Sequence, residues 1–202
     1  MPARRLGVFG GTFDPIHIGH LVVAQEALER LALDRILFVP ARVSPLKRGM
    51  TLFTPEQRVE MVRAAVAPDP RFDVSALDVE RPAPSYTVDT LRLLAEQHGP
   101  DTQFHFILGV DALLTFGYWY RPEEIIRLAR LAVISRPGYA LDLEELDRVL
   151  PGLSAATDLV ETMHIGVSST EIRRRLQEGA SVRYLVPEPA WALLSGYEIS
   201  PA

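Results

Sequence analysis

Two histidines three residues apart follow a pair of glycines near the start of the chain, in the segment "VFGGTFDPIHIGHL". The glycines at 10–11 have no side chain, so their backbone N–H groups can approach a ligand closely. Asp14 precedes a proline and has the form of a helix N-cap, which places His17 and His20 on one face of the opening turns. Gly19 in the same turn costs about 1 kcal/mol relative to alanine, which makes sense where a group approaches the backbone. Free N–H groups, the helix dipole and two imidazoles together favour a phosphate ligand.

Other interpretations of the histidines remain open. His17 and His20 could be ordinary surface or capping residues. A zinc site would need a third ligand, and His98, His105 and His164 are too scattered to supply one. We expect His105, inside an apolar strand, to be a hydrogen-bonded core residue. We expect His98 to end a helix before a glycine, and we assign no role to His164.

Short apolar segments alternate with segments of helical periodicity along the first two thirds of the chain. The predicted strands cover 5–10, 35–40, 72–79, 103–109 and 130–137, and the predicted helices cover 20–33, 55–67 and 87–99. This alternation is typical of an α/β protein with a parallel sheet that is covered on both faces. Ligands of such sheets lie beyond the carboxyl ends of the strands, near the point where strand order reverses. The histidine segment follows the first predicted strand and is therefore expected at that edge.

The remainder of the chain is predicted to be mostly helical from about residue 138. We expect a helix over 138–150, a strand end that enters a helix over 164–179, and a final helix over 186–199. Prolines are scattered, and there is no internal repeat or low-complexity linker. Residues 1–202 are therefore expected to form one domain.

The composition argues against several classes of protein. The 202 residues, 48% of them hydrophobic, are enough for a sizeable core. A net charge of −5 disfavours a nucleic-acid binder, and the absence of cysteine excludes disulfides and thiolate metal sites. No apolar run is long enough to span a bilayer, and the N-terminus does not resemble a signal peptide. We expect a cytoplasmic protein without a nucleic-acid or membrane partner, and a homo-oligomer is compatible with the sequence.

The histidine segment resembles the signature of the nucleotidyltransferase superfamily with the H-x-G-H motif, and more closely that of the bacterial nicotinate-mononucleotide adenylyltransferases. The resemblance extends over nearly the whole chain. It includes "SYTVDTL" (85–91), "FILGVDALLTFGYWYRPEEI" (106–125), "ISRPG" (134–138), "VSSTEIRRRL" (167–176) and "VRYLVPEPA" (182–190). The implied fold is a Rossmann-like, doubly wound parallel sheet of the nucleotidyltransferase type, with helices on both faces.

The resemblance implies that the chain joins ATP to nicotinate mononucleotide and releases pyrophosphate, without a covalent enzyme intermediate. The implied catalytic residues are His17, His20, Lys47 and Arg173. The implied ATP-binding residues are Gly10, Gly11, Thr12, Phe13, Gly109, Asp111, Arg136, Ser168, Ser169 and Thr170. The implied pyridine-nucleotide-binding residues are Ser85, Tyr86, Thr87, Trp119 and Tyr120. Mg²⁺ would accompany ATP without a dedicated protein site, held largely by nucleotide oxygens and water.

The resemblance also implies how the acceptor is selected. Trp119 would stack on the pyridine ring, and the backbone N–H groups of Thr87 and Tyr120 would meet its 3-substituent. A carboxylate only accepts hydrogen bonds, so paired donors suit nicotinate better than a carboxamide. The alternative for Trp119 is packing in the core.

Several of these residues also have a purely structural interpretation. Ser168 and Glu171 have the spacing of a capping box, and Asp111 has the form of a helix N-cap. Arg136 could be a surface arginine, and Lys47 could be an ordinary loop lysine. Arg174 and Arg175 are expected to form a solvated run of charge.

The loop around Lys47 departs from the family pattern. Leu46 stands where a histidine is common, so the contribution of that imidazole is missing or is supplied elsewhere, with Arg48 as a candidate. This departure favours one rival function, a nucleotide-binding regulatory module without catalysis. The other rival is a related adenylyltransferase that acts on nicotinamide mononucleotide or phosphopantetheine.

Overall fold

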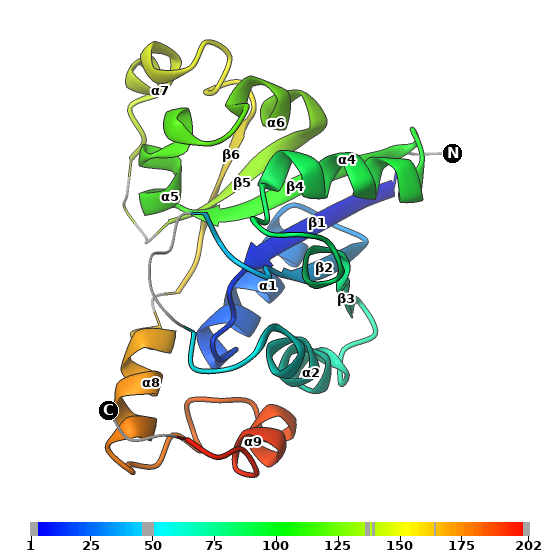
Figure 1. Cartoon of the computed structure of the whole chain (residues 1–202). Helices are drawn as coiled ribbons and strands as arrows, with labels where there is room; N and C mark the ends of the chain where they lie inside the picture. Colours follow the sequence, from blue (N-terminus) through cyan, green and yellow to red (C-terminus); the bar gives the residue numbers. More distant parts are fainter. Residues whose placement is uncertain (1–3, 46–50, 136–137, 139, 164, 200–202) are drawn as a thin grey trace.

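The computed structural model describes residues 4–45, 51–135, 138, 140–163 and 165–199. Six parallel strands form one sheet in the order β3-β2-β1-β4-β5-β6 (Figure 1). The strands are β1 (Arg4–Gly11), β2 (Arg35–Pro40), β3 (Phe72–Val74), β4 (Thr102–Gly109), β5 (Ala129–Ser135) and β6 (Thr157–Glu161). The strand order reverses between β1 and β4, which pair directly with each other. The predicted α/β class and Rossmann-like, doubly wound sheet are therefore confirmed.

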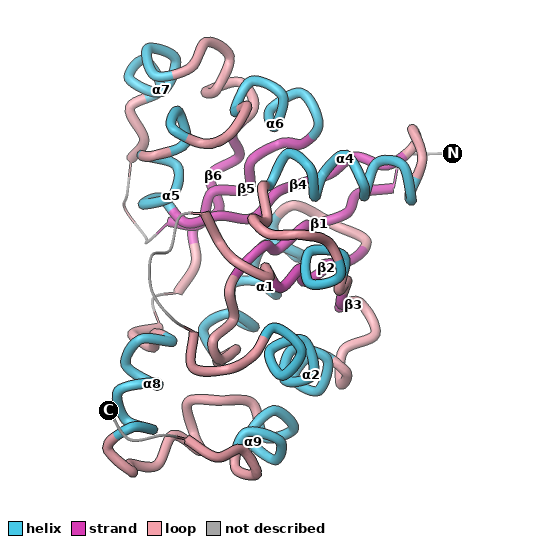
Figure 2. Tube along the Cα trace, in the orientation of Figure 1, coloured by secondary structure: helices cyan, strands magenta, loops and turns pink. Residues whose placement is uncertain are grey.

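Helices link the strands and cover the sheet (Figure 2). They are α1 (Ile18–Arg30), α2 (Pro55–Val66), α3 (Leu77–Glu80), α4 (Thr87–His98), α5 (Val110–Leu114), the 3₁₀ helix η1 (Phe116–Tyr118), α6 (Pro122–Leu128), α7 (Leu143–Val149), α8 (Ser169–Gln177) and α9 (Glu188–Leu194). α2 begins with a complete capping box between Thr54 and Gln57. α4 ends at His98 because Gly99 adopts a positive φ of 78°, as the sequence predicted for His98. Within the described residues, no helix is both long and apolar enough to cross a bilayer.

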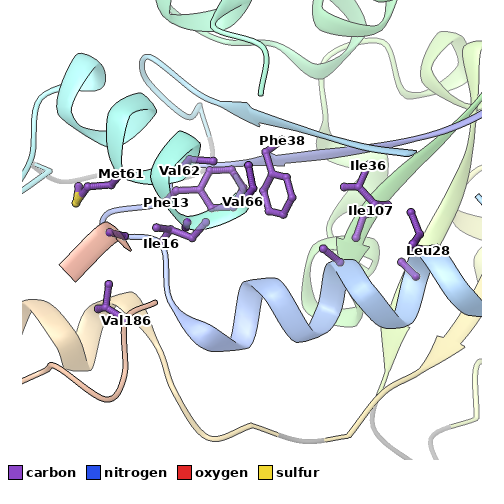
Figure 3. Close-up of a cluster of buried hydrophobic side chains, with 14 of the residues drawn as sticks. Phe13, Ile16, Leu28, Ile36, Phe38, Met61, Val62, Val66, Ile107 and Val186 are labelled. Carbon is purple, nitrogen blue, oxygen red and sulfur yellow. The ribbon is translucent and has the colours of Figure 1, made fainter. Parts of the chain in front are cut away.

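The sheet separates two cores, one on each face, and alternate residues of the central strands enter one or the other. Ile36 and Phe38 of β2 pack in one core with residues of α1, α2, α8 and α9. Leu37 and Val39 enter the other core with residues of α3, α4, α5, α6 and α7. Figure 3 shows the first core, in which Phe13 points toward the side chains of α2. Helices therefore cover both faces, as predicted for a doubly wound sheet.

The structure differs from the predicted elements in several places. The strand expected over 72–79 ends at Val74, and α3 takes up its second half. β6 was not predicted, because this edge strand buries only one residue, Val160, and so has no continuous apolar run. The final helix expected over 186–199 is limited to Glu188–Leu194.

Candidate active site

The loop after β1 places both histidines at the start of α1. His17 is the N-cap residue, and its backbone N–H donates to Nδ1 of His20 at 3.2 Å. The backbone N–H of His20 donates in turn to the carbonyl of His17 at 2.9 Å. The two rings are stacked, with centroids 3.7 Å apart and an angle of 26° between their planes. The capping interpretation therefore holds for this pair, and the same contacts fix the orientation of both imidazoles.

Asp14 is not the N-cap of α1, so that prediction was wrong. The helix begins at Ile18, and the carboxylate of Asp14 accepts hydrogen bonds from the backbone N–H groups of Leu52 and Phe53, each at 3.0 Å. Asp14 is only 3% exposed, and a buried carboxylate needs several donors. The segment before α2 offers two adjacent amides, and they hold the carboxylate away from the helix end.

The glycines of this loop make room for side chains of the same loop. A Cβ atom at Gly19 would lie 3.1 Å from Cε1 and Nδ1 of the His17 ring. A Cβ atom at Gly11 would lie 2.9 Å from the ring of Phe13, which is buried in the core. The expected close approach at Gly19 is therefore present, but the approaching group is an imidazole of the chain itself.

The start of α8 contacts the histidine loop. Ser169 Oγ donates to the carbonyl of Pro15 at 3.0 Å, and Arg173 Nη1 donates to the carbonyl of Asp14 at 2.9 Å. Arg173 Nη1 also lies 3.5 Å from Oδ2 of Asp14, and Nη2 donates to Thr170 Oγ1 at 3.4 Å. A guanidinium has five N–H donors, so donors of the half-buried Arg173 remain for another ligand. The fold thus brings a distant arginine next to the loop that carries both histidines.

The predicted capping box at the start of α8 is only half formed. Ser168 Oγ accepts a hydrogen bond from the backbone N–H of Glu171 at 3.2 Å. The carboxylate of Glu171 pairs instead with Arg174 at 2.7 Å and with Arg175 at 2.8 Å. Hydrogen bonds from Arg174, and then from Arg175, lower the pKa of Glu171 to about 2. Arg174 and Arg175 are therefore part of an exposed network of ion pairs, as expected for a solvated run of charge.

A cavity of about 570 Å³ opens at the carboxyl end of β1, toward α4. Gly10 and Gly11 form part of its wall. The cavity is also lined by all five residues that the resemblance assigns to the pyridine nucleotide, namely Ser85, Tyr86, Thr87, Trp119 and Tyr120. Residues from two distant segments of the chain, 85–87 and 119–120, thus share one site.

Aromatic rings shape this first cavity. Trp119 packs against Phe106 and Phe116, with ring centroids 6.1 Å and 5.2 Å apart. The rings of Tyr86 and Tyr120 lie 4.7 Å apart. The core-packing interpretation of Trp119 is therefore correct, and it is compatible with a role as the wall of the cavity.

A buried carboxylate that the sequence analysis missed supports the 85–87 segment. Asp78, which lines the first cavity, pairs with Arg81 at 2.8 Å and accepts a hydrogen bond from Thr90 Oγ1 at 2.8 Å. Arg81 also donates to the carbonyl of Tyr86 at 3.1 Å. Burial raises the pKa of Asp78, while Arg81 and Thr90 act in the opposite direction. In the sequence, the carboxylate of Asp78 inside the apolar segment 72–79 could have indicated this network.

A second cavity, of about 530 Å³, lies beside the start of α1 and the end of β4. His17, His20, Gly109 and Asp111 line it. A Cβ atom at Gly109 would have no neighbour within 4 Å, so this strand end opens into free space. Asp111 is the second residue of α5, whose N-cap is Gly109, and the N-cap interpretation of Asp111 was therefore wrong.

Several predicted site residues are not part of either cavity wall. The two cavities are not lined by Thr12, by Phe13, by residues 168–170 or by Arg173. Phe13 is 2% exposed, so its side chain is not available to a ligand. The remaining predictions fall outside the described residues and concern Leu46, Lys47, Arg48, Arg136 and His164.

His105 is buried in β4, but it is not the hydrogen-bonded core residue that we expected. Neither ring nitrogen has a hydrogen-bond partner in the described part of the chain, and Nδ1 lies 3.8 Å from Oδ2 of Asp158. Burial lowers the pKa of His105 to about 4, and the nearby charges of Arg5 and Arg130 act in the same direction. The imidazole is therefore neutral near pH 7.

Comparisons with known proteins agree with this geometry. The family model described as cytidylyltransferase-like matches residues 8–175. A protein named probable nicotinate-nucleotide adenylyltransferase from Roseiflexus sp. (strain RS-1) is 42% identical over 197 residues, which are 98% of each chain. A protein of the same name from Thermus thermophilus is 48% identical over 183 residues, 91% of this chain and 92% of the relative. This chain belongs to the nicotinate-nucleotide adenylyltransferases, within the cytidylyltransferase-like family. It is a nucleotidyltransferase, as the resemblance implied.

Solved structures of nicotinate-nucleotide adenylyltransferases have the same fold. The Plasmodium falciparum nicotinic acid mononucleotide adenylyltransferase complexed with APC has a TM-score of 0.72 at 20% identity, and the match covers 96% of each chain. The complex of the same enzyme with NaAD has a TM-score of 0.73. At this identity the likeness supports the fold alone.

Proposed function

We propose that the chain transfers the adenylyl group of ATP to the phosphate of nicotinate mononucleotide, forming nicotinate adenine dinucleotide and pyrophosphate in NAD biosynthesis. This proposal rests on one observation: residues 10–20 border both cavities. Gly10 and Gly11 line the first cavity, and His17 and His20 line the second. Two nucleotides on either side of this segment would have their phosphates next to each other. Phosphoryl-type transfer depends mainly on such alignment and on the stabilisation of charge.

The first cavity suits the acceptor nucleotide. Tyr86, Trp119 and Tyr120 supply flat aromatic faces for a pyridine ring. Thr87 is the first residue of α4, so its backbone N–H is one of the four that a helix leaves without an internal acceptor. A carboxylate on the pyridine ring accepts from such a donor without the mismatch that a carboxamide NH₂ would create.

The second cavity suits ATP. We assign to His17 and His20 the stabilisation of negative charge at the α-phosphate, because they lie at the positive end of α1. Arg173 is assigned to the phosphates and Asp111 to the ribose. Lys47 and Arg136 have the roles that the resemblance implies for them.

The reaction itself requires no group of the protein to form a covalent bond. An oxygen of the acceptor phosphate forms a bond to the α-phosphorus of ATP. The bond from this phosphorus to the bridging oxygen breaks, and its electron pair leaves with pyrophosphate. Donors that are fixed before the reaction stabilise the developing charge best, and the stacked pair His17 and His20 is fixed in this way.

The residues around the second cavity fit a Mg²⁺ ion that ATP carries with it. In the described ranges there is no group of three or more His, Asp or Glu residues that could hold a metal. The carboxylate of Asp14 is already bonded to two backbone amides. Asp111 borders the cavity and adds negative charge near the ion, whose ligands would be phosphate oxygens and water. Bound in this way, Mg²⁺ would neutralise part of the charge on the departing pyrophosphate.

Pyrophosphate release in the presence of ATP and Mg²⁺ tests the proposal. The assay compares nicotinate mononucleotide, nicotinamide mononucleotide and phosphopantetheine, and we expect kcat/KM to be about 100-fold higher with the first. Release with phosphopantetheine alone, or a preference for the nicotinamide nucleotide, would contradict the proposed acceptor. ATP binding without release with any of the three acceptors would support the regulatory module instead.

A further inference from the structure

Arg58 of α2 is a charged side chain that is 0% exposed. Its guanidinium donates hydrogen bonds to four backbone carbonyls, which are those of Thr12 (2.6 Å), Ala41 (2.8 Å), Arg42 (3.1 Å) and Phe53 (3.4 Å). Three of these carbonyls belong to loops that directly follow strands: Thr12 follows β1, and Ala41 and Arg42 follow β2. One side chain thus joins the carboxyl ends of two neighbouring strands.

The sequence carried a signal for this residue. Arg58 shares a helix face with Met61 and Val62, three and four residues further on, and both of these are fully buried. A charged residue on the buried face of a helix must have partners, because an unpaired buried charge is very unfavourable. The four carbonyls are these partners.

The contacts of Arg58 continue to the acceptor cavity. The backbone N–H of Arg42 donates to Ser85 Oγ at 3.0 Å, and the backbone N–H of Ser85 donates to the carbonyl of Val43 at 3.0 Å. Ala41 and Ser85 both line the first cavity. A shift of the loop after β2 would therefore shift the wall of the acceptor site.

The contacts of Arg58 also reach the segment that carries the histidines. The bond to the Thr12 carbonyl fixes the plane of the peptide that joins Thr12 to Phe13, and so the direction of the Phe13 N–H. Phe13 has a φ of 49°, which is unusual for a residue other than glycine and requires support from its surroundings. Arg58 supplies part of this support through its hydrogen bond to the Thr12 carbonyl.

The charge of Arg58 balances a buried carboxylate. Burial lowers the pKa of Arg58, and the negative charges of Asp14 and Glu56 oppose this shift. Arg173 Nη1 lies 3.5 Å from the same Asp14 carboxylate. The charge of Asp14 thus acts on both Arg58 and Arg173 at this end of β1.

We propose that Arg58 is a positioning residue for adenylyl transfer, which holds the loop of the ATP site after β1 at a fixed distance from the loop of the acceptor site after β2. This inference rests on the proposed function and adds a residue to it. Arg58 lines neither cavity. It acts through Thr12 on one side and through Arg42 and Ser85 on the other.

The planar guanidinium is essential to this role. Nε, Nη1 and Nη2 each donate to a different part of the backbone, in directions that are fixed by one rigid group. The ammonium of lysine has three donors on a flexible stem and cannot reproduce this fork. Arg58→Lys therefore keeps the charge but loosens the connection between the loops.

The test compares Arg58→Lys with Met61→Ala in the full chain. Met61 lies on the same face of α2 and is also fully buried, but no hydrogen bond connects its side chain to the loops, so it is a matched control for lost packing. We expect Arg58→Lys to lower kcat by about 30-fold, and Met61→Ala to lower it by less than about threefold at a comparable loss of melting temperature. A kcat for Arg58→Lys within about threefold of the wild type contradicts the inference, and so does an equal loss of kcat in both variants.

A double-mutant cycle provides a second measurement that does not depend on overall stability. Ser85→Ala removes the far end of the same connection, so its effect on kcat/KM should couple to that of Arg58→Lys by about fivefold or more. The cycle of Ser85→Ala with Met61→Ala should be additive. Additive effects in the first cycle would overturn the inference.

The affinity for a non-hydrolysable ATP analogue, measured by calorimetry without an acceptor, separates this inference from the proposed function. We expect binding to Arg58→Lys to be about tenfold weaker than binding to the wild type and to Met61→Ala. A wild-type chain that lacks turnover contradicts the proposed function, whatever the variants bind. Wild-type affinity in Arg58→Lys contradicts the positioning role, whichever acceptor is used.

Discussion

The imidazole rings of His17 and His20 stack at 3.7 Å, while the backbone N–H of His17 donates to Nδ1 of His20. Because Nδ1 accepts this hydrogen bond, the neutral ring of His20 carries its proton on Nε2. The ring also meets Phe9 and Phe13, with centroids 6.0 Å and 5.0 Å away. Capping, stacking and aromatic contacts thus leave this imidazole one orientation, with Nε2–H as its donor.

Replacing His20 should separate its catalytic role from its structural role. We expect His20→Ala to lower kcat by about 100-fold, which corresponds to about 2.7 kcal/mol of transition-state stabilisation. Loss of the contact with the His17 N–H should destabilise the fold by only about 1 kcal/mol, which is about 2–4 °C in melting temperature. His20→Gln keeps an acceptor that can reach the same N–H, so it should restore stability without restoring activity. Activity and melting temperature that recover together would indicate a structural residue.

Trp119 should affect the acceptor more than ATP. Trp119→Ala removes the aromatic face of the first cavity, and we expect the KM for nicotinate mononucleotide to rise by about tenfold while the KM for ATP changes by less than about twofold. The comparison is Tyr184→Ala, which removes an aromatic ring that is 87% exposed and lines neither cavity. An effect of Trp119→Ala on ATP alone would refute the assignment of the first cavity to the pyridine.

Replacing Asp111 should affect ATP more than the acceptor, the opposite of Trp119. Asp111→Asn removes the negative charge at the edge of the second cavity, so we expect the KM for ATP to rise by about tenfold and half-maximal activity to require more Mg²⁺. The KM for the acceptor should stay within about twofold of the wild type. Asp101→Asn replaces an exposed carboxylate just before β4 and serves as the control. Unchanged ATP and Mg²⁺ dependence would remove Asp111 from the ATP site.

The stability of the fold should depend on pH through His105. Its pKa is about 4 in the folded state, against an ordinary value of 6.5. The unfolded chain therefore binds more protons between these values, and the free energy of unfolding should fall by roughly 3 kcal/mol as the pH decreases from 6.5 to 4. His105→Gln does not titrate, so urea denaturation at a series of pH values should show a flatter profile for this variant. The same slope in both proteins would assign the acid sensitivity to other groups.

Sequence patterns predicted the strands that are buried on both faces, because such strands are continuous apolar runs. This holds for β1, β2, β4 and β5, which lie in the middle of the sheet. It fails at the edges, since β3 forms only three residues and β6 buries only Val160. The short helix α6 was also missed, because it has too few turns to show a helical period, and α5 was anticipated only through the N-cap interpretation of Asp111.

The candidate site was predictable in part. The three-residue spacing of His17 and His20 indicated a ligand site, the family resemblance assigned Ser85, Tyr86 and Thr87 to the pyridine nucleotide, and both groups of residues line a cavity. The partners of Asp14 were not predictable, because Leu52 and Phe53 lie almost forty positions away and donate through their backbones. Backbone donors and acceptors have no signature in the sequence, and for the same reason the carbonyl partners of Arg58 were not predictable, although its place on the buried face of α2 was.

Residues 10–20 border one cavity at Gly10 and Gly11 and the other cavity at His17, Gly19 and His20. No residue of this stretch lines both cavities, but all of them belong to one continuous segment, so a backbone shift at one end would disturb the other end. A redesign for an unnatural substrate should therefore begin at walls outside this segment, around Trp119 for the first cavity or Gly109 for the second.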